Sequence, residues 1–281
     1  MRTIDVNILT QKVAELCQNS NFYIDPLVIE KIKYFRNQET SQLAKNILDT
    51  LLQNYQLAAE QKMPICQDTG IANIFLEVGS QVQFTNGDVN QAIQAGVEQG
   101  YKLGYLRKSV VSDPLFQRKN TQTNTPALIY WETVPGDKIK LTVAPKGAGS
   151  ENMSRIAMLK PADGKQGVVD FVLAAVQKAG GNPCPPIIVG IGIGGSFDKA
   201  ALLAKKALLQ PLDSSNADSR YAALETELLQ KINDLQIGPQ GLGGKTTALK
   251  VNILQQPCHI ASLPVAVNIQ CHVHRHQTVE I

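Results

Sequence analysis

Residues 186–209 read PIIVGIGIGGSFDKAALLAKKALL, and the stretch changes from strand-like to helical composition within a few residues. The apolar run over 186–193 ends in glycines and has the length of a buried strand. Ser196 suits the N-cap of a helix, because its hydroxyl can accept a backbone N–H of the first turn. We therefore expect a short buried strand over 186–193, a tight turn, and a helix over 196–209.

On both sides of this stretch, helices and strands are mixed without strict alternation. Apolar residues at helical spacing predict helices over the first 62 residues, one beginning after Pro26 and another near Ser41. Further elements are expected as strands over 71–78, 246–254 and 264–273, helices over 88–104, 168–179 and 218–235, a β-hairpin over 127–144 with its turn at 135–137, and a loop over 210–220. The pattern indicates an α+β fold, a helical N-terminal region followed by mixed sheets flanked by helices, and we expect a single domain over 1–281.

The composition excludes several classes of protein. Hydrophobic residues make up 43% of the 281 residues, which is enough for a core, and the net charge of +3 is too small for a nucleic-acid-binding surface. There is no run of about 18 apolar residues that could span a membrane, and the N-terminus lacks the apolar segment of a signal peptide. We expect a cytoplasmic protein whose five cysteines, an odd number, are reduced.

Two glycine-rich segments resemble phosphate-binding loops. The glycines of residues 190–195 satisfy G-x-G-x-x-G between a strand and a helix, which leaves a nucleotide-binding oxidoreductase open as an alternative. The simpler interpretation is a tight turn that points a helix N-terminus at an anion. The segment 241–246, GLGGKT, fails as a P-loop because Pro239 occupies the position of the first glycine and a strand-like run follows. Its glycines still expose Lys245, which we expect to bind an anionic substrate.

Three cysteines stand beside proline or glycine, where the chain turns and can present a side chain. They are Cys66 in PICQDTG, Cys184 in NPCPP, and Cys271 at the end of LPVAVNIQC. Cys17 lies in a helical pattern and is expected in the core, and the setting of Cys258 is less clear. From their spacing alone, buried structural thiols are the commoner interpretation of these three residues.

The segment from Cys271 to His276 offers another alternative. His272, His274 and His276 alternate along the sequence, so in an extended chain they share one face. With Cys271 they could ligate zinc in a non-catalytic metal-binding subunit. A solvated C-terminal tail is the simpler interpretation, and it is the one we expect.

Six blocks in a fixed order carry a resemblance that extends from about residue 10 to residue 271. They are PICQDTG (64–70), YLRKSVV (105–111), PKGAGSENMSR (145–155), NPCPPIIVGIGIGG (182–195), GPQGLGGKTTAL (238–249) and HIASLPVAVNIQC (259–271). Together they resemble the α subunit, or N-terminal domain, of the iron–sulfur (class I) fumarate hydratases, a family that includes the L-tartrate dehydratase α subunit. The sequence departs from the family pattern at Ala148, which interrupts a glycine triplet, and in the tail after Cys271.

The resemblance implies a cofactor and a set of site residues. A [4Fe–4S] cluster would be held by Cys66, Cys184 and Cys271, leaving one iron without a cysteine. That iron would act as a Lewis acid in the reversible hydration of a C4 dicarboxylate, with fumarate to L-malate expected and L-tartrate dehydration as the alternative. By resemblance the substrate is contacted by Gln67, Asp68, Arg107, Gly147, Gly149 and His259, with Asp68 and His259 as the catalytic residues.

Some of these residues also have simpler structural interpretations. Arg107 could form a surface ion pair, His259 could be a hydrogen-bonded core histidine, and Asp68 could close an Asx-turn. A regulatory paralogue without activity is a further alternative.

The resemblance also implies a partner. In one-chain members of the family a second domain follows the cluster domain and carries further substrate contacts and the proposed base. We therefore expect a separate β subunit to complete the site in a heterodimer or heterotetramer. If fumarate is the substrate, the enzyme serves the tricarboxylic acid cycle.

Overall fold

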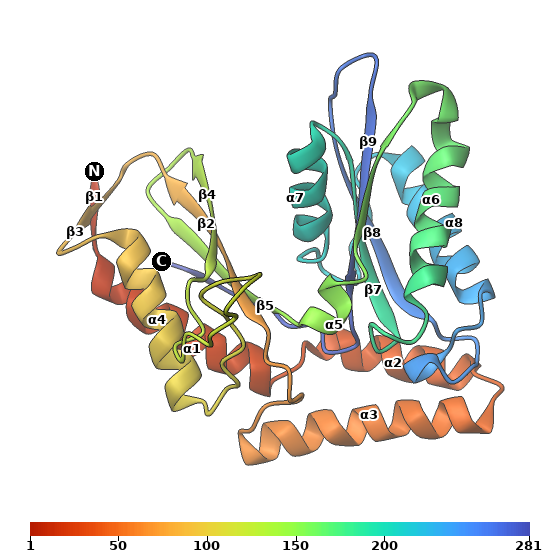
Figure 1. The fold of residues 1–281 in the computed structure, drawn as a ribbon, viewed down its shortest axis with the longest axis horizontal. Coiled ribbons are helices and arrows are strands. Elements are labelled where there is room, and N and C mark those ends of the chain that lie inside the picture. Colours follow the sequence, from red (N-terminus) through yellow and green to blue (C-terminus); the bar gives the residue numbers. More distant parts are fainter. The chain divides into compact units, whose positions relative to one another are not determined.

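The computed structural model describes residues 1–281 and shows helices together with mixed sheets, which confirms the α+β class. By their internal contacts the residues divide into two compact units. Unit 1 comprises residues 1–24, 54–148 and 275–281, and unit 2 comprises residues 25–53 and 149–274. The chain therefore crosses between the units four times, at 24/25, 53/54, 148/149 and 274/275. Figure 1 labels most of the helices and strands. None of the helices combines the length and the apolar composition of a transmembrane span.

Unit 1 packs two helices on a four-stranded sheet. The sheet has the order β10-β5-β2-β4, formed by Gln277–Glu280, Ile139–Lys146, Ile71–Gly79 and Leu128–Val134. Helices α1 (Val6–Phe22) and α4 (Val89–Leu103) share one apolar core with β2 and β5. The two helices can approach closely because Gly96 of α4 has no side chain. A Cβ there would lie only 2.6 Å from the Thr10 carbonyl oxygen of α1. Two short parallel strands, β1 (Arg2–Asp5) and β3 (Val82–Thr85), form a separate ribbon.

The β-hairpin predicted over 127–144 does not form. β4 and β5 border the turn at 135–137 as expected, but β2 lies between them, parallel to β4 and antiparallel to β5. The cause is burial: β2 is buried along most of its length and takes a central position, whereas β4 is largely exposed and forms the edge. Local turn chemistry located the two strands correctly and assigned the wrong partner to each.

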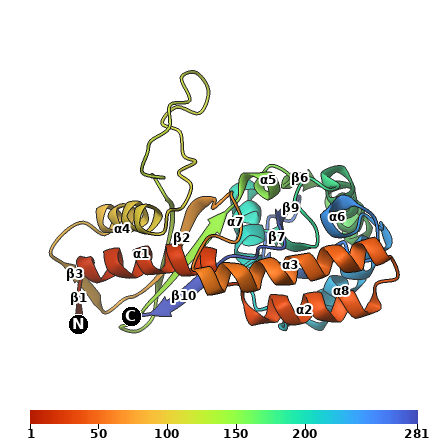
Figure 2. The ribbon, with the colours of Figure 1, turned by 90° about the horizontal axis from the view of Figure 1, so that it is seen from below.

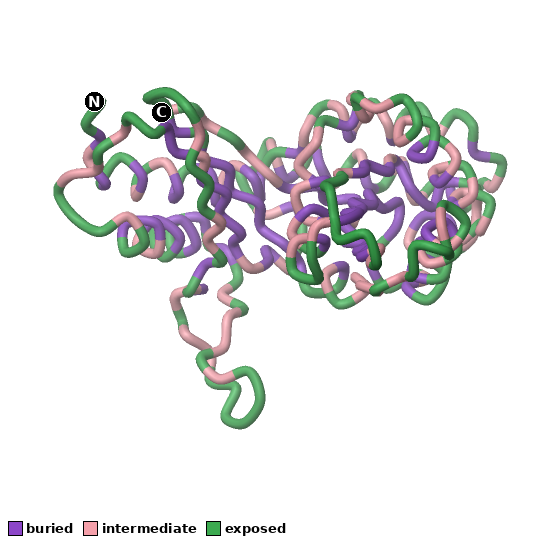
Figure 3. The backbone as a smooth tube through the Cα atoms, turned by 90° about the horizontal axis from the view of Figure 1, so that it is seen from above, coloured by how far each residue is buried: buried purple, intermediate pink, exposed green.

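Residues 105–124 form a long arm that projects from unit 1 (Figures 2 and 3). Its base is fixed by the buried Asn124, whose side chain donates to the Gly70 carbonyl oxygen at 3.1 Å and accepts the Ser109 N–H at 2.7 Å. The arm carries Arg107 close to this base. The position of Arg107 is therefore tied to the start of β2.

Unit 2 is a four-stranded sheet with helices on both faces (Figure 1). The order is β6-β9-β7-β8, formed by Arg155–Leu159, Leu263–Gln270, Ile187–Gly194 and Ala248–Gln256. β7 and β8 are parallel, while β9 is antiparallel to β6 and β7. Helices α6 (Gly164–Ala179) and α8 (Ser219–Asp234) cover one face, and α7 (Phe197–Ala207) covers the other. The remaining elements are α2 (Pro26–Gln38), α3 (Gln42–Gln61), α5 (Ala148–Glu151) and two 3-10 turns (Pro161–Asp163 and Pro239–Gly241), and a unit boundary falls within both α3 and α5.

Helix packing accounts for the glycines of β7. A Cβ at Gly190 would lie 2.2 Å from the Ala204 carbonyl oxygen, and one at Gly192 would lie 2.1 Å from the Ala200 carbonyl oxygen, both in α7. Only glycine lets a helix lie this close to the strand. The structure therefore favours a packing role for these two glycines over the nucleotide-binding alternative. In the other glycine-rich segment, Lys245 is followed by a strand, β8, and not by the helix that a P-loop requires.

The expectation of a solvated C-terminal tail is wrong. The side chains of His272, Val273, His274 and Arg275 are all buried. Nε2 of His274 lies 2.6 Å from the Leu208 carbonyl oxygen and must donate to it, and burial lowers the pKa of this histidine. A neutral imidazole that donates its N–H to a carbonyl oxygen can be buried in a core. The alternation of histidines along the chain gave no sign of this burial.

Candidate functional site

The turn over residues 65–70 follows α3 and leads into β2, and it carries the first predicted ligand. The side chains of Cys66 and Gln67 are exposed. Gly70 ends the turn with a φ of +76°, and a Cβ there would lie 2.7 Å from the backbone of Lys146. Glycine at this position therefore lets the turn enter the sheet directly beside β5.

The carboxylate of Asp68 fastens the turn from within. Its Oδ1 accepts the Gly70 N–H at 2.9 Å, which is the Asx-turn geometry considered for this residue. Its Oδ2 accepts the Ala148 N–H, also at 2.9 Å. Asp68 is half-exposed, so a carboxylate held in one orientation faces solvent beside Cys66 and Gln67.

A buried tyrosine supports the end of the turn. The hydroxyl of Tyr101 lies 2.8 Å from the Thr69 carbonyl oxygen and 2.9 Å from the Gly70 carbonyl oxygen. Burial raises the pKa of Tyr101 well above its usual range, so the hydroxyl keeps its proton and acts as a donor.

The inner side of the turn is held by amide and guanidinium groups. Ile65 donates its N–H to the Asn21 carbonyl oxygen, and Asn54 donates from Nδ2 to the Ile65 carbonyl oxygen, both at 2.9 Å. Nη1 of the buried Arg275 donates to the Asp68 carbonyl oxygen at 2.6 Å and to Oδ1 of Asn21 at 3.0 Å. Three helices and the C-terminal segment of unit 1 thus fix one short turn.

Arg107 is an available cation beside this turn. Its carbonyl oxygen accepts the Thr69 hydroxyl at 3.0 Å, which connects the arm to the turn. Its side chain is exposed and forms no ion pair with a carboxylate. The surface ion pair considered for Arg107 is therefore not formed, and the guanidinium is open to an anionic ligand.

The two predicted glycines of the 147–149 segment differ in their surroundings. A Cβ at Gly147 would lie 3.0 Å from Oδ2 of Asp68 and 3.2 Å from Nη2 of Arg275, which is tighter than an ordinary contact. A Cβ at Gly149 would make an ordinary contact of 3.5 Å with the Asn182 carbonyl oxygen. Only Gly147 is therefore packed against the Asp68 carboxylate.

In unit 2 the other two predicted ligands lie at one end of the sheet. Cys184 precedes β7, and Cys271 follows β9, which runs antiparallel to β7. The N–H of His272 donates to the Cys184 carbonyl oxygen at 3.4 Å, so the two cysteine turns are in direct contact. Cys184 is exposed and Cys271 is half-exposed.

The glycine loop, residues 238–246, packs on the same end of the sheet. The backbone N–H and the side-chain Nε2 of Gln240 both donate to the Pro185 carbonyl oxygen, at 2.8 and 2.9 Å. Because Pro185 follows Cys184 directly, the loop supports the cysteine turn. The side chain of Lys245, at the end of this loop, is exposed.

A carboxylate that the sequence analysis missed holds the glycine loop. Glu39 is 3% exposed, and its Oε2 accepts the N–H of Lys245 at 2.8 Å and the N–H and hydroxyl of Thr246 at 3.1 and 3.2 Å. Its Oε1 accepts the N–H groups of Thr40 and Ser41. Burial raises the pKa of Glu39, but the backbone hydrogen bonds outweigh it and hold the pKa below its usual range.

His259 lies apart from this end of the sheet. It is exposed in the connection between β8 and β9, where its Nδ1 accepts the Ala261 N–H at 3.1 Å. β8 and β9 contain 9 and 8 residues, and at about 3.3 Å per residue they separate the two ends of the sheet by about 25 Å. Unit 2 by itself therefore does not bring His259 close to Cys184 and Cys271. Because the side chain of His259 is exposed, the interpretation as a core histidine is excluded.

Comparison with known proteins agrees with the motif pattern and its geometry. The family model described as Fumarate hydratase (Fumerase) matches residues 10–280. The chain belongs to the fumarate hydratase family. It is 42% identical over 268 residues, covering 94% of each chain, to a protein of Methanocaldococcus jannaschii provisionally named L(+)-tartrate dehydratase subunit alpha. It is 34% identical over 277 residues to the L(+)-tartrate dehydratase subunit alpha of Escherichia coli K12, covering 98% of this chain and 91% of the relative.

Membership of the fumarate hydratase family confirms the resemblance and assigns the chain to the hydro-lyases. The match covers both units and includes all three predicted cysteine ligands. The nucleotide-binding oxidoreductase is therefore no longer an alternative for this chain.

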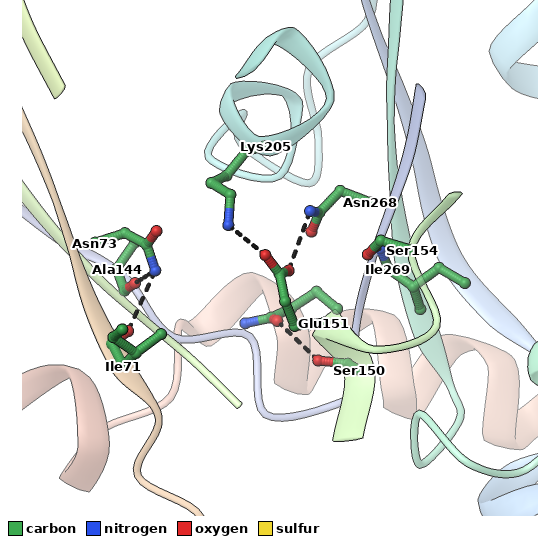
Figure 4. A network of polar contacts seen from close by, with 10 residues as sticks. Ile71, Asn73, Ala144, Ser150, Glu151, Ser154, Lys205, Asn268 and Ile269 are labelled. Carbon is green, nitrogen blue, oxygen red and sulfur yellow. Dashed lines mark hydrogen bonds and ion pairs between the residues drawn. The ribbon is translucent and has the colours of Figure 1, made fainter. Parts of the chain in front are cut away.

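A second carboxylate that the sequence analysis missed, that of Glu151, ties residues 150 and 151 to other parts of unit 2 (Figure 4). Glu151 pairs with Nζ of Lys205 at 2.6 Å and accepts Nδ2 of Asn268 at 3.1 Å. The neighbouring Ser150 hydroxyl lies 3.5 Å from Oε1 of Gln270, the last residue of β9. Residues 150 and 151 are therefore fixed to β9, the strand that leads directly to Cys271.

The thiols of the family motifs differ chemically from the core thiol. Cys17 is fully buried, and burial raises its pKa to about 12, which disfavours the thiolate that binds metals. Cys66 and Cys184 are exposed on turns, where a thiolate is solvated and can reach a metal. The donor set of the three motif cysteines therefore fits a thiolate-bound group.

The zinc alternative is not supported by the arrangement of the tail. No three His, Cys, Asp or Glu side chains are grouped closely enough to hold a single metal ion. In the tail, His274 uses its Nε2–H on a backbone carbonyl oxygen. An iron–sulfur cluster is a different case, because its cysteines bind different iron atoms and stand further apart than the ligands of one ion.

Proposed function

We propose that the chain is the α subunit of an iron–sulfur hydro-lyase that removes water from L(+)-tartrate. The observation that carries the proposal is the set of accessible thiols on fixed turns at Cys66, Cys184 and Cys271. The curated relatives named as L(+)-tartrate dehydratase alpha subunits support tartrate as the substrate. Fumarate was the preferred expectation from the sequence, and these relatives give it no specific support.

The three cysteines would hold a [4Fe–4S] cluster as thiolates. Bound in this way, the cluster supplies Lewis-acid chemistry through an iron without a cysteine, which lets hydroxide leave at neutral pH. The chain's own task is to bind a small dianion, hold it in one orientation, and move protons.

Two exposed cationic side chains can bind the negatively charged carboxylates of the substrate. Arg107 presents a planar guanidinium that can bind a carboxylate through two parallel hydrogen bonds. Lys245 presents an ammonium at the end of the glycine loop. Gln67 adds amide donors next to Cys66, and the small Gly147 and Gly149 allow a carboxylate to approach the backbone.

Dehydration of tartrate requires two proton transfers. One carbon loses its C–H proton, the neighbouring carbon loses its hydroxyl as water, and the resulting enol tautomerises to oxaloacetate. By resemblance His259 is a catalytic residue, but it lies at the opposite end of the unit 2 sheet from Cys184 and Cys271, so we assign the C–H proton to a base on the β subunit. Asp68 keeps lone pairs after accepting two backbone N–H groups and can accept a substrate hydroxyl.

A β subunit completes the enzyme in this proposal. The names of the relatives as alpha subunits support a heteromeric assembly. Fumarate hydration is the second candidate, because the family model that matches residues 10–280 is described as fumarate hydratase.

The test is an anaerobic assay of the reconstituted chain with and without its candidate β subunit. We expect oxaloacetate from L-tartrate only when both chains are present, with a higher kcat/KM for L-tartrate than for fumarate. A higher kcat/KM for fumarate would select the second candidate. Full turnover by the lone chain would refute the β subunit, and no turnover of either substrate by the assembled pair would refute the hydro-lyase.

A further inference from the structure

Arg275 is a buried cation whose hydrogen bonds go to neutral acceptors rather than to a carboxylate. Its side chain is 3% exposed, and no carboxylate forms an ion pair with it. Its hydrogen bonds go to two neutral acceptors, the Asp68 carbonyl oxygen and Oδ1 of Asn21, and its Nε has no hydrogen-bond partner. Taking a guanidinium out of water in this way costs free energy that neutral acceptors only partly return. A buried guanidinium that is only partly compensated in this way suggests a role beyond filling the core.

The guanidinium of Arg275 lies directly behind the turn that carries Cys66 and Asp68. It lies on the inner side of the turn whose outer side exposes Cys66 and Gln67. A Cβ at Gly147 would touch both Oδ2 of Asp68 and Nη2 of Arg275, so the carboxylate and the guanidinium flank the same glycine. The turn carries the Asp68 carboxylate, and the Cys66 thiolate and a bound dicarboxylate add further negative charge there if the proposed function holds.

We infer that Arg275 is a positioning residue for the Cys66–Asp68 turn. Its guanidinium fixes the Asp68 carbonyl and supplies a permanent positive charge behind the turn, and the second part of this role rests on the proposed function. Arg275 acts through Asp68 and does not itself contact substrate. Neither the sequence motifs nor the family comparison assigns it a role.

Two substitutions separate this role from simple filling of the core. Arg275→Met keeps much of the volume and removes both the donors and the charge, whereas Arg275→Lys keeps the charge and a single donor group. Arg155→Met is the matched control, because the Arg155 guanidinium also donates to two carbonyl oxygens, those of Asn152 and Ser154, and forms no ion pair.

The first measurement needs neither cofactor nor partner. Hydrogen exchange of the isolated chain reports on the Gly70 and Ala148 amides, which donate to the Asp68 carboxylate. We expect Arg275→Met to speed exchange at these amides by about tenfold, the effect of losing one charge-assisted hydrogen bond, while Arg155→Met leaves them unchanged. Unchanged protection in Arg275→Met would overturn the inference. If Arg275→Met does not fold, the same measurement on Arg275→Lys decides, since one ammonium cannot hold Asp68 and Asn21 as a guanidinium does.

The second measurement uses the assembled enzyme. We expect kcat/KM to fall by about 100-fold in Arg275→Met, mainly through kcat, and to recover partly in Arg275→Lys. Loosened amides with an unchanged kcat/KM would overturn the positioning role. A wild-type pair that turns over no C4 diacid would instead refute the proposed function, and the exchange result would still decide whether Arg275 holds the turn.

Discussion

The carboxylate of Glu39 accepts the backbone N–H of Lys245 at 2.8 Å, although 206 positions separate the two residues in the sequence. The anion is buried and is solvated entirely by backbone N–H groups and one hydroxyl. The segment after α2 thereby fixes the glycine loop, and Gln240 of this loop donates to the Pro185 carbonyl oxygen. A structural carboxylate in one part of unit 2 thus supports the turn that presents Cys184.

Glu39→Gln should destabilise the chain. The amide nitrogen would face N–H donors in place of an acceptor, and we expect the free energy of unfolding to fall by about 1–3 kcal/mol. Urea unfolding at pH 7 measures the difference. Glu60→Gln is the control, because Glu60 is exposed and accepts only Gln56 within its own helix. Equal effects of the two substitutions would contradict the role of Glu39.

The stability of the Glu39 contact should also depend on pH. Burial raises the pKa of Glu39, but its backbone hydrogen bonds together hold the pKa below its usual range. The stabilisation is therefore complete above the pKa of an unfolded-state glutamate, about 4.3, and is lost as the pH falls through the lower folded-state value. The stability difference between wild type and Glu39→Gln should shrink below about pH 4. A difference that stays constant from neutral pH into this range would show that Glu39 is not ionised in the fold.

The three motif thiols should separate from the other two in chemical tests. Serine at Cys66, Cys184 or Cys271 should abolish iron and sulfide uptake on anaerobic reconstitution, whereas Cys258→Ser should retain it. In the chain without metal, Cys17 should resist alkylation, because it is fully buried and its pKa is raised to about 12. Metal analysis and mass spectrometry of the alkylated protein measure both effects. Full cluster content in any one of the three motif variants would exclude that cysteine as a ligand.

Gly147 and Gly149 should respond differently to the same added methyl group. At Gly147 a Cβ would press on the Asp68 carboxylate and the Arg275 guanidinium, whereas at Gly149 it would meet only an ordinary contact. We expect Gly147→Ala to lower kcat/KM by about 100-fold through displacement of Asp68, and Gly149→Ala to lower it by less than tenfold. Steady-state kinetics of the assembled enzyme decide. Similar losses would mean that the backbone of the segment, rather than Asp68, is the sensitive element.

Arg107→Met should weaken substrate binding. The guanidinium has no ion pair within the chain, so its removal costs little stability and deletes a charge available to a carboxylate. We expect KM to rise at least tenfold with an unchanged unfolding temperature. Arg118→Met on the same arm is the control, since Arg118 is exposed and donates only to the Pro114 carbonyl oxygen. An unchanged KM in Arg107→Met would remove this residue from the substrate site.

Local sequence patterns predicted the long elements of this fold and failed on strand pairing. Helical periodicity placed α4 and α8 to within a residue or two, and the apolar run before Gly195 located β7. The pairing of β4 with β5 was wrong because the position of β2 depends on its burial from both sides, which turn chemistry does not express. The four-residue strands β1, β3 and β10 were missed because they are too short to show a period.

The candidate site was predictable where residues stand in motifs and not where they support motifs. The exposed turns that carry Cys66 and Cys184 were predicted because proline and glycine mark them. Glu39, Tyr101 and Arg275 were missed because each acts through contacts with residues distant in sequence, and no local pattern marks a buried group whose partner is a backbone atom.

The division of unit 1 into three chain segments has a consequence for protein synthesis. Residues 275–281 belong to unit 1, yet the whole of 149–274 is translated before them. Until those residues leave the ribosome, β5 lacks its neighbour β10 and the Asp68 carbonyl lacks its guanidinium. All residues of unit 2 are therefore synthesised before those of unit 1 are complete. Unit 1 is begun first and completed last. The turn that bears Cys66 gains its contact with Arg275 only after the last segment of unit 1 has been synthesised.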